Sequence, residues 1–325
     1  MARFLRPLGE TLVSRPRTTA HLVAAGVSPY ELSGALWTRV LRGTYVWGPG
    51  PAQVDEPRTR ILAAAELMPK GAAIGGWAAL HLLGVLDMDG RTGPGAAVEL
   101  PVLVCVGPAG RMRRRPGVHV DRSALGPHDL AEVDGVSVTT AVRSCVDIMR
   151  SDGLEEGTVA GDAAIRFGAM TRAGLITYVA GVSRMRAIPV IRRAAALVDG
   201  RAASRPESRF RVVWVVEAGL PVPLVNCDVV DEQGFLLGVA DLIDLEAAMV
   251  GEYDGKDHRD LKRHTSDNVR EEGFERHNLV VVRATALDLW PRRARLVTRL
   301  QAAHRDGLSR DRSRDRWDIR RWTTT

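Results

Sequence analysis

Hydrophobic residues recur along the chain with two different periods, and these periods outline the fold. Runs with a spacing near 3.6 residues predict helices over 57–67, 76–86, 139–149, 154–167, 171–182 and 188–198. Short apolar runs separated by polar turns predict strands over 98–106, 118–121 and 133–138. We therefore predict an α/β protein, α+β overall, whose middle region is a structural scaffold.

The first fifty residues begin with two short helical patterns separated by a turn. The first covers residues 18–25, and the second opens with a capping box formed by Ser28, Pro29 and Glu31. We expect the second helix to carry Leu32, Leu36 and Val40 on one face and to run into a short strand. Helix, tight turn, helix and β wing is the order of a winged helix-turn-helix.

In a winged helix-turn-helix, polar side chains face a DNA groove and basic side chains near the wing meet phosphates. The candidate DNA contacts are Ser28, Tyr30, Ser33, Thr38 and, at the junction of helix and wing, Arg39 and Arg42. The alternative is a small helical domain that serves protein contacts, because any two short helices fit this pattern.

Acidic residues mark the ends of two apolar runs over 236–245 and 247–253, which we predict to be paired strands. Glu252 and Asp254 share a face, because strand residues i and i+2 point the same way. If the hairpin brings Asp241 opposite them, three carboxylates converge, and such a cluster requires a cation such as Mg²⁺ or Mn²⁺. Lys256 and His258 follow and would orient a water or offset phosphate charge. The alternative is an exposed hairpin without chemistry.

The residues around this hairpin resemble the Vsr-like family, the very-short-patch-repair-like endonuclease domains of the PD-(D/E)xK superfamily. The motifs are an ESxxR helix, a G-x-x-D strand, an E-x-D-G-x-x-H strand end and a final VVVRAT strand, all within 205–290. The resemblance implies a mixed sheet flanked by helices, with Asp241 as central metal ligand and Glu252 as second acid. It makes Glu207 the supporting helical acid. Asp254 stands where the superfamily has lysine, with Lys256 as a substitute.

Residues 6–50 resemble the N-terminal domain of AbiEi-type antitoxin proteins, on the motif TAHLVAAGVS…LWTRVLRGTYVWGPG. That family places a winged helix before a larger α/β domain, and it implies a promoter-binding regulator with a toxin partner or a homodimeric form. We expect a winged helix over 1–50, a middle domain over 51–200 and the nuclease-like domain over 201–303. Residues 199–206 are the predicted boundary. Residues 304–325 alternate Arg with Asp and predict a disordered tail.

The net charge of +6 and pI of about 9.7 favour a polyanionic partner such as DNA. Clustered arginines in a turn, Arg113, Arg114 and Arg115, are further candidate phosphate contacts, although a solvated turn has the same composition. Arg143 and Asp147 predict a surface ion pair at helical spacing. The three cysteines lack disulfide or zinc spacing and predict buried thiols in a cytoplasmic protein. No apolar run predicts a membrane span.

Two hypotheses follow from these patterns. The first is a DNA-binding protein with a metal-dependent endonuclease domain, in which Asp241, Glu252 and Asp254 hold Mg²⁺ or Mn²⁺. Lys256, His258 and Glu207 would assist the hydrolysis of the phosphodiester. The second is a non-catalytic antitoxin-like regulator that carries an inactive nuclease fold.

Overall fold

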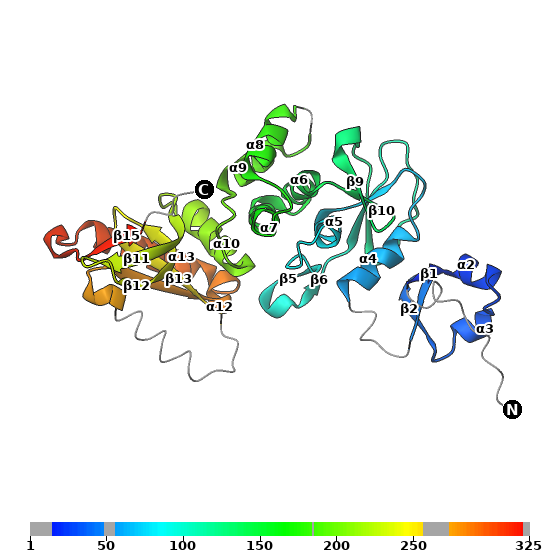
Figure 1. The fold of residues 1–325 in the computed structure, drawn as a ribbon, viewed down its shortest axis with the longest axis horizontal. Helices are drawn as coiled ribbons and strands as arrows, with labels where there is room; N and C mark the ends of the chain where they lie inside the picture. Colours follow the sequence, from blue (N-terminus) through cyan, green and yellow to red (C-terminus); the bar gives the residue numbers. More distant parts are fainter. Residues whose placement is uncertain (1–14, 49–55, 184, 256–272, 321–325) are drawn as a thin grey trace. The chain divides into compact units, whose positions relative to one another are not determined.

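A computed structural model describes residues 15–48, 56–183, 185–255 and 273–320 (Figure 1). The chain forms two compact units. Unit 1 comprises Met1–Thr92 and Ala96–Ser151, and unit 2 comprises Gly93–Gly95 and Asp152–Thr325. Helices and mixed sheets occur together, which confirms the α+β class. The division falls between Ser151 and Asp152, whereas the sequence suggested residues 199–206.

Unit 1 opens with a small winged arrangement. Its elements are β1 (Arg17–Thr18), α2 (Thr19–Ala24), α3 (Pro29–Leu32), β2 (Trp37–Leu41) and β3 (Thr44–Trp47), with the strands in the antiparallel order β1-β3-β2. Leu22, Val27, Leu32 and Trp37 form its core.

The predicted length of the second helix is wrong, although its predicted capping box is confirmed. Ser28 and Glu31 form that box, but α3 ends at Leu32, and Val40 lies on β2. Ser33 closes the helix, and Trp37 then packs edge-on against Trp47 with ring centroids 5.1 Å apart. The cross-strand aromatic pair and the β-branched residues of this segment favour a hairpin over a longer helix.

The rest of unit 1 contains a five-stranded sheet in the order β8-β7-β4-β10-β9, a separate two-stranded sheet, β5-β6, and helices. The elements are α4 (Pro57–Ala65), β4 (Ala73–Gly75), α5 (Gly76–Leu82), β5 (Arg91–Thr92), β6 (Val98–Glu99), β7 (Val102–Cys105), β8 (Val118–Asp121), β9 (Leu130–Val133), β10 (Val136–Thr139) and α6 (Ala141–Ser151). The predicted strand over 133–138 is instead a hairpin. Asp134 and Gly135 both have positive φ, of 51° and 76°, as an Asp-Gly turn of the mirror-image type requires.

The Arg143–Asp147 pair forms as predicted, but it is buried and does not lie on the surface. The two side chains are 1% and 0% exposed, and Arg143 Nε donates to the Asp147 carboxylate at 3.0 and 3.1 Å. A second nitrogen of Arg143 donates to Asp129 at 2.8 Å. A buried charge is tolerated when it is paired and hydrogen-bonded, so this network belongs to the interior of unit 1.

Unit 2 consists of helices followed by a second five-stranded sheet. The helices are α7 (Gly153–Arg166), α8 (Arg172–Gly181), α9 (Ile188–Leu197) and α10 (Arg205–Val212), which continues as a π-helical turn, η4 (Val213–Glu217). The strands are β11 (Leu224–Asp231), β12 (Leu236–Asp244), β13 (Met249–Asp254), β14 (Val280–Thr285) and β15 (Trp317–Arg320), and α12 (Ala286–Leu289), α13 (Arg293–Leu308) and η5 (Arg312–Arg314) precede the last strand. The sheet order is β14-β13-β12-β11-β15, and β13 and β14 run parallel whereas the other neighbouring strands in this order are antiparallel.

The sheet of unit 2 has a hydrophobic core on each face. One core joins the sheet to α10, η4, α12 and α13 and includes Phe210, Trp214 and Leu242. Gly251 lies beneath this layer, where an added Cβ would stand 2.9 Å from both Phe210 and Trp214. The other core includes Val250, Ile243 and Phe274.

Residues 304–320 belong to the predicted disordered tail but instead form the end of α13, the turn η5 and the strand β15. Strand β15 pairs antiparallel with β11 and forms an edge of the sheet. Trp317 and Ile319 pack against the core that contains Val250, while Asp318 and Arg320 are exposed. This alternation has the period of a strand, which the surrounding Arg and Asp residues obscured.

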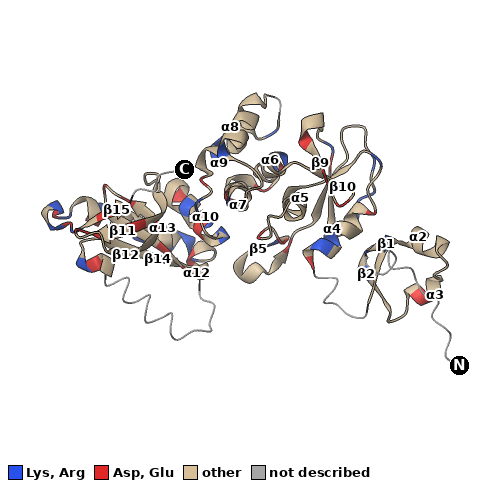
Figure 2. Ribbon diagram, viewed as in Figure 1, with Lys and Arg blue, Asp and Glu red and all other residues tan. Residues whose placement is uncertain are grey.

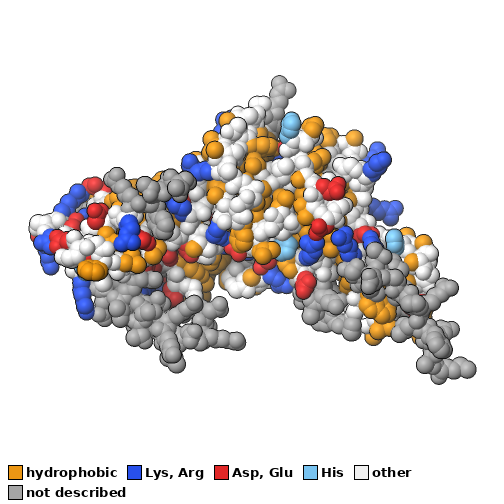
Figure 3. Space-filling view, viewed as in Figure 1, with side chains coloured by type: hydrophobic (Ala, Val, Ile, Leu, Met, Phe, Trp, Pro, Cys, Tyr) orange, Lys and Arg blue, Asp and Glu red, His pale blue; other side chains and the backbone are white. Residues whose placement is uncertain are grey.

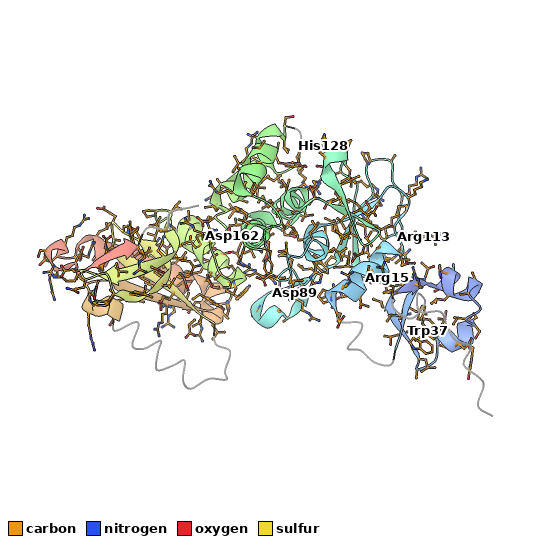
Figure 4. The ribbon with its side chains drawn as sticks, in the orientation of Figure 1. Arg15, Trp37, Asp89, Arg113, His128 and Asp162 are labelled. Carbon is orange, nitrogen blue, oxygen red and sulfur yellow. The ribbon has the colours of Figure 1, made fainter. Side chains whose placement is uncertain are left out.

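Ion pairs between α10 and α7 join the helices of unit 2 to its sheet. Arg211, 2% exposed, donates to Asp162 Oδ2 at 2.5 Å and also to the Leu197 carbonyl. Arg209 donates to Glu155 and Glu156 at 2.6 and 2.8 Å and lies over the Trp290 ring. Figure 2 shows the basic residues of α10 in blue, and Figure 4 labels Asp162 on α7.

We predict that Arg211→Met destabilises unit 2 by about 3–5 kcal/mol, because it leaves the buried Asp162 carboxylate without its charged partner. The free energy of unfolding would be measured in urea, with amide hydrogen exchange to assign the transition to unit 2. Arg192→Met, at an exposed position of α9, is the control and should change little. Adding Asp162→Asn to Arg211→Met should restore part of the loss; a double variant no more stable than the single one would contradict this account.

We also predict that Gly307→Ala destabilises unit 2 by about 1–3 kcal/mol through overpacking. An added Cβ at Gly307 in α13 would stand 2.0 Å from the Ala247 carbonyl oxygen. Gly181 at the end of α8 has no atom within 4 Å of an added Cβ, so Gly181→Ala is a matched control. That control should be neutral or stabilising by up to about 1 kcal/mol. Equal effects of the two changes on the unfolding midpoint would contradict the prediction.

Candidate functional site

The predicted pairing of the two apolar runs is confirmed, and Asp241 lies where this pairing ends. Strands β12 and β13 are antiparallel, with Leu242 opposite Gly251 as the last pair of the ladder. Beyond that pair, the Asp241 carboxylate accepts a hydrogen bond from the Tyr253 backbone N–H at 2.7 Å. A side-chain oxygen thus replaces the next backbone acceptor, which fixes the Asp241 carboxylate beside β13.

Four polar residues lie at the same level on four successive strands, and we call them the polar row: Asn226, Asp241, Glu252 and Arg283. Asn226 and Asp241 lie between the paired positions Val225–Leu242 and Cys227–Ala240. One step beyond Leu242–Gly251, the register of β12 and β13 brings Asp241 level with Glu252. Glu252 is paired directly with Arg283 across the parallel strands. The sheet therefore brings together residues that are far apart in the sequence.

Glu252 is the most deeply buried acid of the polar row, at 4% exposure. Arg283 Nε lies 3.7 Å from Glu252 Oε2, and the Arg283 side chain is 27% exposed. Burial opposes ionisation of a carboxyl group unless a cation or hydrogen bonds compensate, and Arg283 supplies such a cation.

Glu207 lies next to the polar row but acts first as a cap of α10. Ser204 is the N-cap, and the Glu207 carboxylate accepts hydrogen bonds from Ser204 Oγ and the Ala203 N–H, both at 2.7 Å. Asn226 Nδ2 also donates to Glu207 Oε2 at 3.2 Å. Glu207 is therefore connected to the row through Asn226, as an acid held at the start of a helix.

Asp254 lies two residues beyond Glu252, level with Thr285, and is partly buried. The intervening Tyr253 packs against the core on the α10 side. Burial raises the pKa of the Tyr253 hydroxyl, and the negative charge of Asp254 raises it further. Alternation along the strand therefore places Glu252 and Asp254 on the other face. The predicted Lys256 and His258 lie outside the described residues.

The polar row offers a divalent ion few protein ligands. Within residues 15–48, 56–183, 185–255 and 273–320, no three His, Cys, Asp or Glu side chains come together as a metal-binding group. Asp241 and Glu252 are the two carboxylates that the register brings level. Mg²⁺ is commonly held by one or two carboxylates, with water and substrate phosphate as the remaining ligands, so this pair fits.

In the winged part, most of the predicted hydroxyl contacts are engaged within the protein. Ser28 Oγ bonds to the Glu31 carboxylate at 2.7 Å, Ser33 Oγ donates to the Tyr30 carbonyl at 2.7 Å, and Thr38 Oγ1 donates to the Gly48 carbonyl at 2.8 Å. Tyr30 is 83% exposed. These serines and threonine therefore shape the turn, cap and hairpin, while Tyr30 faces outward.

The two basic residues predicted at the junction of helix and wing, Arg39 and Arg42, lie instead on the β2–β3 hairpin. Arg39 is on β2 and Arg42 is in the turn before β3, and both are exposed. The helix α3 ends earlier, at Leu32, so the β hairpin alone presents these two arginines.

The clustered arginines Arg113, Arg114 and Arg115, which we call the arginine segment, contact this hairpin through Arg115. Arg115 donates to the Arg42 carbonyl oxygen at 2.9 Å, while Arg113 and Arg114 are exposed; Figure 4 labels Arg113. A hollow of about 470 Å³ is lined by Arg114, Arg115, Pro116, Val118, His119 and Val120. Basic and acidic side chains are otherwise interspersed on the face that Figure 3 shows. The Arg115–Arg42 hydrogen bond places two sets of basic residues, distant in sequence, beside each other.

No protein-family model matches this chain, and neither a curated protein nor a solved structure shows significant similarity to it. The resemblances to Vsr-like endonucleases and AbiEi-type antitoxins therefore remain expectations based on sequence motifs. In the described part of the chain, none of the helices combines the length and apolar character needed for a membrane span.

Sequence reasoning missed two members of the polar row, Asn226 and Arg283. Asn226 has a positive φ of 49°, a conformation that Asn adopts more readily than most residues. Arg283 is a charged residue within a largely apolar strand, and this could have marked it in the sequence as a candidate site residue. Which acid it would meet depends on the register between β13 and β14, which the sequence does not reveal.

Proposed function

We propose that this protein binds DNA and that unit 2 carries a metal-dependent phosphodiesterase centre at the polar row. The observation that supports the proposal is the level placement of Asp241 and Glu252 on neighbouring strands, with Glu207 connected to them through Asn226. The sequence resemblance assigns these same three acids to the site of Vsr-like endonucleases.

In this proposal, Asp241 and Glu252 hold Mg²⁺ or Mn²⁺. A bound divalent ion supplies Lewis-acid polarisation of the phosphodiester and a lower pKa for an attacking water. The Tyr253 N–H holds the Asp241 carboxylate in place. Asn226 donates a hydrogen bond to Glu207, which connects the start of α10 to the polar row of the sheet. Lys256 and His258 remain the proposed assisting groups. Asp254, predicted as a third ligand, forms no group of three with Asp241 and Glu252 in the described part of the chain.

DNA recognition belongs to unit 1 in this proposal, through Tyr30 and the exposed arginines of the hairpin and the arginine segment. Arginine side chains suit phosphate oxygens because the planar guanidinium presents several donors at once. The Arg115–Arg42 hydrogen bond supports their use as one surface.

A second candidate function is a non-catalytic regulator, which is favoured by the use of Glu207 as a helix cap and by Asp254 in the lysine position. In that case unit 1 would bind a promoter, and unit 2 would contact DNA, a toxin partner or a second copy of the chain. Cleavage of DNA separates the two candidates.

The first experiment is incubation of the full chain with plasmid and short duplex DNA in Mg²⁺ or Mn²⁺. We predict metal-dependent cleavage that falls at least about 100-fold in Asp241→Ala, because the central ligand is removed. Mn²⁺ binding, followed by calorimetry, should weaken in the same variant and in Glu252→Gln.

Glu246→Gln is the matched control, since Glu246 lies in the turn of the same hairpin with its side chain 69% exposed. It should cleave DNA and bind Mn²⁺ like the wild type. Equal DNA binding by wild type and Asp241→Ala, without cleavage or metal binding by either, would refute the catalytic proposal and favour the regulator.

For DNA binding, we predict that Arg113→Gln with Arg114→Gln lowers the salt dependence of affinity. The slope of log K against log salt should fall by about one for each phosphate that the variant no longer binds. Arg192→Gln with Arg193→Gln removes the same charge from exposed positions of α9 and should leave the slope near that of the wild type. Identical slopes for the two double variants would rule out the arginine segment as part of the interface.

A further inference from the structure

The proposed site is rich in acids, because Asp241 lies level with Glu252 and Asp254 lies two residues beyond Glu252 on the same strand. Asp241, Glu252 and Asp254 together would repel a phosphodiester unless cations offset them. A cation that contacts this set within the described residues is Arg283, whose Nε lies 3.7 Å from Glu252.

Arg283 and Glu252 lie on the same face of the sheet. Val282 and Ala284 pack into the core on the α10 side, so alternation directs Arg283 to the opposite face. Glu252 also lies on that face, because its neighbours Gly251 and Tyr253 approach the α10 side. The two residues are paired in register on parallel strands.

The neighbouring strand provides a nearer position for a cation than the same strand does. Positions two apart on one strand are separated by about 6.6 Å, whereas adjacent strands are about 4.8 Å apart. The Glu252 carboxylate is almost fully buried, and the Arg283 side chain is partly exposed, at 27%. The Arg283 side chain thus reaches from the buried acid to solvent.

The backbone of Arg283 is held in place from the other side of the sheet. Arg299 of α13 donates to the Arg283 carbonyl oxygen and lies 3.3 Å from Asp288. Asp288 in turn accepts the Thr285 N–H at 3.0 Å, which caps α12 directly after the strand. These contacts fix the end of β14 and therefore the origin of the Arg283 side chain.

We infer that Arg283 binds the scissile phosphate of the DNA backbone and offsets the negative charge of the neighbouring acids. This inference rests on the proposed nuclease function and adds a substrate-binding residue to it. The five N–H donors of a guanidinium and its fixed charge suit the non-bridging phosphate oxygens.

The test compares wild type, Arg283→Gln and Arg283→Lys in Mn²⁺-dependent cleavage. We expect Arg283→Gln to lower kcat by about 100-fold, as removal of one charge-stabilising donor does, and Arg283→Lys to recover part of it. Calorimetry should show that Arg283→Gln binds Mn²⁺ at least as tightly as the wild type. The reason is that the substitution removes a positive charge that would repel the ion. Arg295→Gln, at an exposed position of α13 on the other side of the sheet, is the charge-matched control.

The outcomes separate the two proposals. If wild type cleaves and Arg283→Gln cleaves equally well, the Arg283 role is refuted while the nuclease stands. If Arg283→Gln loses both Mn²⁺ binding and cleavage, Arg283 is a structural partner of Glu252, and its proposed role in phosphate binding is also refuted.

If wild type does not cleave, the nuclease proposal fails, and binding of a short duplex in Ca²⁺ then decides the role of Arg283. This is measured in the Arg113→Gln, Arg114→Gln background, which weakens the unit 1 contribution. Weaker binding with Arg283→Gln than with Arg295→Gln would retain Arg283 as a phosphate contact. Equal binding would refute it.

Discussion

The position of helix α10 is the constraint on which unit 2 depends. Arg209 and Arg211 bind acids of α7, while Phe210 and Trp214 pack onto the sheet. These contacts alternate around α10 and its continuation η4, so α10 cannot shift without exposing a core or separating a buried charge from its partner. Gly251 completes the fit, because any side chain there would collide with both rings. Glu207, at the start of the same helix, is thereby placed beside Asn226.

A local departure from regular strand geometry is part of the same arrangement. Asn226 adopts a left-handed conformation, and the β12–β13 ladder ends just before Asp241. Regular backbone pairing would occupy the Tyr253 N–H that Asp241 now accepts. Such conformations cost free energy and persist where the surrounding packing determines them, so this irregularity supports a functional interpretation of the row.

Elements with strong local patterns could be predicted from the sequence, whereas arrangements set by long-range contacts could not. Most helices and the β12–β13 hairpin lie close to their expected places, because their apolar spacing reflects burial. The burial of Arg143 and the pairing of β15 with β11 depend on partners distant in sequence. The same holds for the site. Asp241 and Glu252 are joined by a short turn, but Asn226 and Arg283 join them only through the register of separate strands.

The positive net charge of the protein also acquires a different meaning once burial is known. Arg60, Arg143, Arg209 and Arg211 are all buried, and each lies beside at least one acid. Their charges are largely compensated within the fold, so they contribute little to the field outside it. The excess that a polyanion would experience must come from exposed residues such as Arg39, Arg42, Arg113 and Arg114. For this chain, the arrangement of exposed arginines is thus a better guide to the proposed DNA contact than the total charge.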